Sequence, residues 1–158
     1  MQDRETRAAK AAELFADGFH CSQAVLCACA GLFREEEPPQ ELIAAMAPFA
    51  SGMVGSGQVC GALTGALATI GFTLGKTTPK GLNHQKMNLI GQEMMQEFTK
   101  ITAEYGGMNC ADIAQVNWQD NEAIRQFRTD PNSRRQHCVC VVKETSACLQ
   151  DLVEKHLA

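Results

Sequence analysis

The chain has 158 residues, of which 45% are hydrophobic and 20% are charged, and this balance favours one globular domain over a disordered chain. Its formal net charge is −4 and no dense stripe of Lys and Arg runs along it, which argues against nucleic-acid binding. The first five residues are hydrophilic and lack the apolar segment of a secretory signal. We therefore expect a soluble cytoplasmic protein whose eight cysteines are free thiols, metal ligands or redox groups rather than structural disulfides.

Apolar residues spaced by three and four positions predict a first helix over residues 4–16. An uncharged second helix is predicted from about 20 to 33, which indicates burial on most of its sides. A short helix over 41–47 then leads into a glycine-rich loop at 52–57. A third buried helix begins near residue 60, and its glycines spaced by four predict a tight crossing with another helix.

The stretch between Glu41 and Lys76 contains no charged residue and is long enough to span a bilayer. It is interrupted by Pro48 and several glycines, and only residues 59–74 are continuously apolar. That length fits a buried helix better than a membrane span. We therefore expect no membrane span.

A long amphipathic helix is predicted over 83–105, where apolar residues again step by three and four. A short helix begins at 109 or 110, another covers 120–127, and the last runs over 137–157. No period-two alternation and no internal repeat is present. The predicted fold class is therefore all-α, a single-domain helical bundle of about five to seven helices over residues 1–158.

Four of the eight cysteines fall at predicted helix starts: Cys21, Cys60, Cys110 and Cys138. The N-terminus of a helix offers unpaired N–H groups and a partial positive charge, which lower the pKa of a thiol placed there. Four such positions in one small chain predict a cluster of thiolates. The alternative is that all four are buried thiols that only pack.

Helical angles distinguish the remaining cysteines. A rotation of about 100° per residue places Cys138 on the core-facing side with Val142 and turns Cys140 toward solvent. If the last helix begins later than predicted, Cys140 could take the functional position instead. Three others are predicted to be small core residues: Cys27, Cys29 and Cys148.

Two segments resemble a known family. Residues 18–26 read GFHCSQAVL, which is similar to a G-[YF]-x-C-[AS]-Q-A-V-L opening, and residues 55–65 read GSGQVCGALTG, a glycine loop followed by C-G-A-x-x-G. Cys110 and Cys138 follow as later single cysteines. Together these features resemble the redox-active protein family named for its C…GCAxxG…C…C pattern, here with the order Cys-Gly-Ala.

The resemblance implies that four shared cysteines carry the function, at positions 21, 60, 110 and 138 of this chain. Members of the family accompany oxidoreductase or transporter functions, and a related domain occurs in split-Soret cytochromes. An iron–sulfur or other metal centre is the cofactor that the resemblance implies. The chain contains no C-x-x-C-H motif, which excludes covalent haem of the c type.

Our first hypothesis is a redox protein in which these four cysteines ligate an iron–sulfur cluster for electron transfer or redox sensing, since four thiolates are the usual ligand set. A tetrahedral zinc site uses the same set, but the wide ligand spacing lacks the paired cysteines of zinc ribbons. Gly57 and Gly61 are the predicted cofactor-binding residues, since a glycine loop lets backbone N–H groups approach sulfur or a small anion.

Two alternatives remain open at this point. The first is metal-free thiol–disulfide chemistry, which would need cysteines paired across helices because no C-x-x-C motif is present. The second is a non-catalytic helical interaction module with buried cysteines, for which the methionine-rich helix over 83–105 offers a contact surface. A redox partner protein and a homodimer are both compatible with the sequence, as are an enzyme and an electron carrier.

Overall fold

The fold is all-α, as the sequence predicts. The computed structural model describes residues 3–157, and within that range no residue belongs to a β-strand. The α-helices are α1 (Arg4–Ala16), α2 (Cys21–Cys29), α3 (Gln40–Met46), α4 (Ala50–Met53), α5 (Gly61–Leu74), α6 (Met87–Thr102), α7 (Cys110–Ile113), α8 (Asn121–Thr129) and α9 (Arg135–Leu157). Short 3-10 segments extend α2, α3 and α6: Ala30–Leu32, Ala47–Phe49 and Ala103–Tyr105. In this part of the chain seven helices have seven residues or more, which agrees with the predicted number, while α4 and α7 are single turns.

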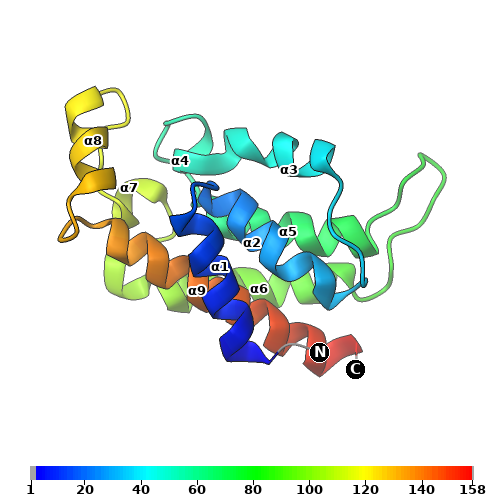
Figure 1. Ribbon diagram of the computed structural model, residues 1–158. Coiled ribbons are helices and arrows are strands. Elements are labelled where there is room, and N and C mark those ends of the chain that lie inside the picture. The colour runs from blue at the N-terminus through cyan, green and yellow to red at the C-terminus, as the bar shows by residue number, and fades with distance from the viewer. Residues whose placement is uncertain (1–2, 158) are drawn as a thin grey trace.

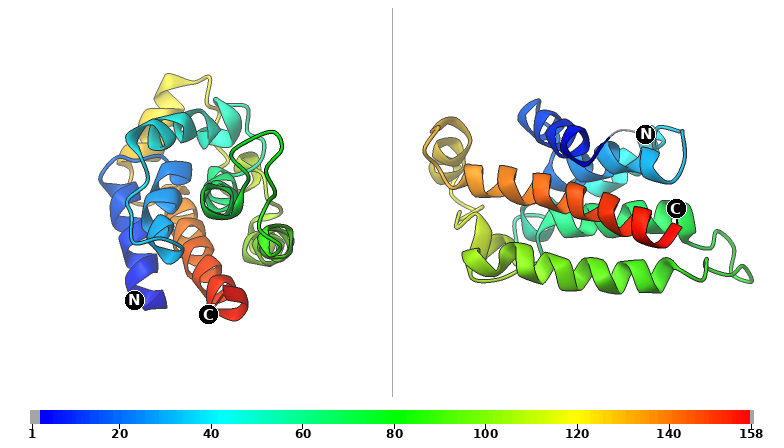
Figure 2. Two further views of the ribbon diagram at one scale, coloured as in Figure 1. Left: turned by 90° about the vertical axis from the view of Figure 1, so that its right-hand side faces the viewer. Right: turned by 90° about the horizontal axis from the view of Figure 1, so that it is seen from below.

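The longest helix, α9, lies at the centre of the core. Figure 2 shows α9 running between α1 and α6, and it also contacts α2 and α5. Val142 and Leu149 of α9 are fully buried. Ile90, Met94 and Phe98 of α6 are spaced by four residues, which places them on one helix face, and all three are fully buried. The core faces predicted from the spacing of apolar residues are therefore confirmed for both helices.

Helices α2 and α5 cross at close range. No charged residue occurs in α2, and its residues from Ser22 to Cys29 are buried. Gly65 of α5 lies directly against the backbone of Ser22, because a Cβ atom at position 65 would overlap the Ser22 carbonyl oxygen. The tight crossing expected from the glycine spacing thus occurs at Gly65. Figure 1 shows α3 and α4 arranged over α2 and α5, and α8 projecting at one end of the molecule.

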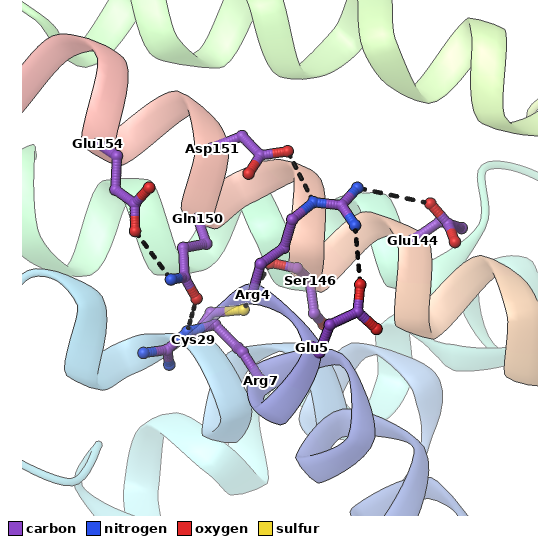
Figure 3. A network of polar contacts seen from close by, with 9 residues as sticks. All are labelled: Arg4, Glu5, Arg7, Cys29, Glu144, Ser146, Gln150, Asp151 and Glu154. Carbon is purple, nitrogen blue, oxygen red and sulfur yellow. Dashed lines mark hydrogen bonds and ion pairs between the residues drawn. The ribbon is translucent and has the colours of Figure 1, made fainter. Parts of the chain in front are cut away.

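A polar network ties α1 to α9 and α2 (Figure 3). Arg7 is only 4% exposed, and its Nε donates a hydrogen bond of 2.8 Å to Oε1 of Gln150. The same guanidinium also donates to the carbonyl oxygen of Ala28. At the surface, Arg4 donates from Nε to a carboxylate oxygen of Asp151 at 2.9 Å. A buried charge is tolerated when it is hydrogen-bonded in this way, so Arg7 fixes how α1 sits on the core.

Helix α6 begins later than predicted, at Met87 rather than near Asn83. The reason is that residues 83–86 form a loop closed on the end of α5. Asn83 accepts a hydrogen bond of 2.8 Å from the Lys76 backbone N–H, and the His84 N–H donates to the Leu74 carbonyl oxygen at 2.8 Å. Within residues 3–157, no helix combines the length and apolarity that crossing a bilayer requires.

Candidate functional site: a pocket lined by four cysteines

The structure brings the four predicted cysteines to one pocket. Cys21 is the first residue of α2, Cys60 immediately precedes α5, Cys110 is the first residue of α7, and Cys138 lies in the first turn of α9. Their predicted positions at helix starts are therefore confirmed. All four line a single pocket with a volume of about 420 Å³. Segments far apart in the sequence thus meet at one group of thiols.

The chain between α3 and α5 has an uncommon backbone conformation beside this pocket. Four consecutive residues have left-handed φ angles: Ser51, Gly52, Met53 and Val54. A left-handed conformation costs roughly 1–2 kcal/mol for each residue with a Cβ atom, so this turn is strained. It is held by hydrogen bonds from the Val54 N–H to the Pro48 carbonyl oxygen at 2.8 Å and from the Gln58 N–H to the Gly52 carbonyl oxygen at 3.0 Å. The turn directs the backbone N–H of Ser51 at the Cys21 sulfur.

A short antiparallel pairing holds Cys60 beside Cys110. The Cys60 N–H donates to the Met108 carbonyl oxygen at 3.0 Å, and the Cys110 N–H donates to the Gln58 carbonyl oxygen at 2.6 Å. The Gly57 carbonyl oxygen accepts from the Ala111 N–H at 3.1 Å. Gly57 has a φ of 69° and close contact with Ala111, but it is not among the residues that line the pocket. We therefore infer that Gly57 holds α7 in place.

Cys21 and Cys60 form a hydrogen-bonded pair. The Cys60 thiol donates to the Cys21 sulfur, and this hydrogen bond is the main reason that the pKa of Cys21 is lowered from the ordinary value of 9.0. Backbone N–H groups of Ser22 and Ser51 lower it further. The same hydrogen bond, together with burial, raises the pKa of Cys60 well above 9.0. Of the two, Cys21 is thus the thiol that loses its proton more readily, and Cys60 is the one that keeps it.

Gly61 makes this arrangement possible. A Cβ atom at position 61 would lie 2.5 Å from the Cys21 sulfur and 3.0 Å from the Phe49 carbonyl oxygen. Both distances are far below an ordinary van der Waals contact of about 3.5–4.0 Å between heavy atoms. Unlike Gly57, Gly61 lines the pocket. The glycine of the Cys-Gly-Ala motif therefore provides the space in which the Cys21 sulfur rests.

The other two cysteines have raised rather than lowered pKa values. Burial raises the pKa of Cys110 to about 11 and that of Cys138 to about 12. The prediction that all four helix-start thiols would have lowered pKa values is therefore wrong for Cys60, Cys110 and Cys138. Burial outweighs the helix N-terminus at Cys110 and Cys138, and at Cys110 the helix is a single turn with little dipole.

The remaining cysteines lie outside the pocket. Cys140 is exposed and is not a lining residue, so Cys138 is the pocket cysteine of α9, as the helical angles predict. Cys27 and Cys29 are buried, and Cys148 is half-buried against the core. Within residues 3–157, no three His, Cys, Asp or Glu side chains are grouped so that they could hold a metal ion. The donor type of the four thiols fits an iron–sulfur or zinc centre, but their present spacing does not.

Several pocket residues were not found by sequence reasoning. They come from five different segments: Phe15, Ser51, Trp118, Phe127, Arg128 and Arg135. Trp118 packs edge-on against Phe127, with ring centres 5.4 Å apart, and its buried indole N–H has no hydrogen-bond partner in the described part of the chain. The indole lowers the pKa of Cys110. The chain contains a single Trp, which could have marked position 118 for attention. Arg128 lies in the last turn of α8, and nothing in its local sequence indicates a role in the site.

The fold and pocket define an all-α protein with four thiols from four segments around one cavity. The chain matches the family model described as "Putative redox-active protein (C_GCAxxG_C_C)" over residues 19–152. It therefore belongs to this family, as the two motif segments indicate. No curated protein and no solved structure matches the chain.

Proposed function

We propose that the pocket is a redox site in which Cys21 and Cys60 alternate between a dithiol and a disulfide. The observation that carries this proposal is the closeness of the two cysteines: both line the pocket, and the Cβ position of Gly61, the residue after Cys60, lies 2.5 Å from the Cys21 sulfur. The neighbouring Cys60 thiol also lowers the pKa of Cys21. A thiolate is the nucleophile in thiol–disulfide exchange, and a thiol in contact with it is placed to resolve the intermediate. We therefore place thiol–disulfide chemistry before a metal centre, whereas the sequence alone favoured the metal centre.

The proposed reaction uses a disulfide as the oxidant. The Cys21 thiolate attacks one sulfur of the substrate disulfide, forms a mixed disulfide and releases the first half of the substrate as a thiolate. Cys60 gives its proton to that thiolate and attacks the Cys21 sulfur, which releases the second half as a thiolate. The protein loses two electrons and the substrate disulfide gains them. A dithiol reductant would return the Cys21–Cys60 disulfide to the starting state.

An iron–sulfur centre, or zinc as a further alternative, is a second candidate for the same pocket. A specific feature favours it: burial raises the pKa values of Cys110 and Cys138, and negative charge at nearby cysteines raises them further. Buried thiols of this kind become thiolates most readily when a cation offsets their charge. The four pocket cysteines would then be the ligands, Gly61 would let the backbone approach, and the bound cluster would supply electron transfer. This state requires the sulfurs to move closer together.

One preparation of the protein distinguishes the disulfide function from the metal centre. The protein is purified without oxygen and analysed for iron, acid-labile sulfide and zinc, and the metal-free portion is treated with an excess of a small disulfide. Mass spectrometry of the digested protein should then identify a Cys21–Cys60 crosslink, which the Cys21→Ser and Cys60→Ser variants lose. Cys140→Ser is the matched control, because Cys140 is exposed and outside the pocket. Iron with sulfide that depends on all four pocket cysteines would favour the cluster instead.

A further inference from the structure

Apart from the cysteines, the charged side chains that line the thiol pocket are all positive. Arg128 and Arg135 line it, and none of its described lining residues is Asp or Glu. The whole chain has a net charge of −4, so this local excess of positive charge is not a property of the protein as a whole. A concave site lined by one sign of charge raises the local concentration of ligands of the opposite sign.

The two arginines are available to a ligand. Arg135 is held with its guanidinium carbon 4.4 Å from the centre of the Phe15 ring, and it donates one hydrogen bond of 3.1 Å to the Phe15 carbonyl oxygen. A guanidinium has five N–H donors, so most of those of Arg135 remain free. In the described part of the chain, neither Arg135 nor Arg128 is paired with a carboxylate, whereas Arg125 on the same helix as Arg128 pairs with Glu122 at 2.6 Å.

The size and the other walls of the pocket suit a small molecule. Its volume of about 420 Å³ lies within the range of about 300–1,000 Å³ that is usual for small-molecule sites. Phe19, Trp118 and Phe127 supply apolar walls. Carboxylates, like phosphates, are anions that a guanidinium recognises with two parallel hydrogen bonds.

We propose that the substrate of the Cys21–Cys60 pair is a low-molecular-weight disulfide that carries carboxylates. Arg128 and Arg135 bind the carboxylates, and the disulfide bond lies against the Cys21 sulfur. This inference rests on the proposed function, since it names the substrate class of the same site. The exchange reaction and its electron balance are those given above.

The test compares three disulfides of similar length and different charge. The reduced protein is mixed with the dianion 3,3′-dithiodipropionate, the neutral 2-hydroxyethyl disulfide or the dication cystamine, and the formation of the Cys21–Cys60 disulfide is followed by quenching and mass spectrometry. Each rate constant is divided by that of a free thiol with the same disulfide, which removes intrinsic reactivity. At low salt we expect the dianion to be favoured over the neutral compound by about 10-fold or more, and 0.5 M salt to remove most of this preference.

Variants of the two arginines test whether these residues cause the preference for the dianionic disulfide. Arg128→Gln combined with Arg135→Gln should reduce the preference to about 2-fold or less. Because Arg135 also packs on Phe15, the single exposed change Arg128→Glu serves as a second variant that leaves this contact intact, and it should lower the preference at least several-fold. Arg125→Gln, a surface change on the same helix, should leave the preference unaltered.

The outcomes separate the inference from the proposed function. Equal normalised rates for the three disulfides, with the Cys21–Cys60 disulfide still forming, would overturn the charge-based selection and leave the redox pair in place. If none of the three disulfides oxidises Cys21, the proposed function is wrong and the inference is wrong with it. A preference for the dianion that Arg128→Glu does not reduce would also contradict the assignment.

Discussion

The replacement Gly61→Ala tests the central contact of the site. The new methyl group would lie 2.5 Å from the Cys21 sulfur, so one of the two must move by about 1 Å to reach an ordinary contact. Overpacking of this kind costs roughly 1–3 kcal/mol of stability. The displaced sulfur would also lose hydrogen bonds from Cys60 and from the Ser51 N–H, the groups that lower its pKa. A rise in pKa of about one corresponds to about 1.4 kcal/mol and to a roughly 10-fold smaller thiolate fraction at neutral pH.

The assay is alkylation of Cys21 by iodoacetamide between pH 5 and 9, measured on the peptide that contains it. We expect the pH profile of the Gly61→Ala protein to shift upward and the formation of the Cys21–Cys60 disulfide to slow by about 10-fold at pH 7. Gly71→Ala is the matched control. It lies on α5 with no heavy atom within 4 Å of the new Cβ, so it should leave the profile unchanged and stabilise the helix by about 0.5–1 kcal/mol.

A clear result would refute this reasoning. If Gly61→Ala keeps the wild-type alkylation profile and the wild-type rate of disulfide formation, the Cys21 sulfur does not rest against position 61. A loss of stability in urea without a change in the profile would mean that Gly61 serves only the packing of α5. In either case the structural explanation for the Cys-Gly-Ala motif would be wrong.

Three further predictions follow from other parts of the structure. Arg7→Met removes the hydrogen bonds to Gln150 and to the backbone of α2 and should lower the free energy of unfolding by about 3 kcal/mol in urea titrations, with no change in the rate of disulfide formation. Cys29 keeps its proton in the folded state up to about pH 11, while the unfolded thiol loses it near 9.0, so its contribution to stability is present below pH 9 and is lost as the pH rises through 11. Between pH 9 and 11 the free energy of unfolding should therefore fall less in Cys29→Ala than in the wild type, by at most about 2.7 kcal/mol, as measured by chemical denaturation. Trp118→Phe removes the indole N–H that lowers the pKa of Cys110, so this pKa should rise and the alkylation of Cys110 at pH 9 should slow about 5-fold, a result that an unchanged rate would contradict.

Local patterns in the sequence predict most of the helices. The first helix is predicted at its observed bounds, residues 4–16, because the spacing of its apolar residues is a local signal. Helix α6 is predicted four residues too early, since residues 83–86 have no local signal that distinguishes them from a helix start. The helix does not begin earlier because residues 83–86 are held against α5 by the hydrogen bond from the His84 N–H to the Leu74 carbonyl oxygen. Contacts of this kind lie outside any short sequence window.

The site is only partly predictable for the same reason. The four cysteines can be identified from their helix-start positions, and their convergence on one pocket follows that prediction. Their pKa values cannot be predicted in this way, because burial and contact with another sulfur depend on the packing of four segments. The same holds for Arg128 of α8 and Arg135 of α9, which reach the pocket from segments far from α2 in the sequence.

The difference between the four pKa values is itself a functional argument. If all four thiols were ionised at neutral pH, their mutual repulsion would oppose the packing of the helices that carry them. Burial keeps Cys110 and Cys138 protonated, and the hydrogen bond to Cys21 keeps the proton on Cys60, so Cys21 is the one pocket thiol whose pKa is lowered. Disulfide exchange requires one thiol that ionises readily beside one that keeps its proton, whereas a metal centre would require the other thiols to lose their protons on binding. The strained turn at 51–54 is consistent with this, since the Ser51 N–H that it directs at the Cys21 sulfur stabilises negative charge at that one atom.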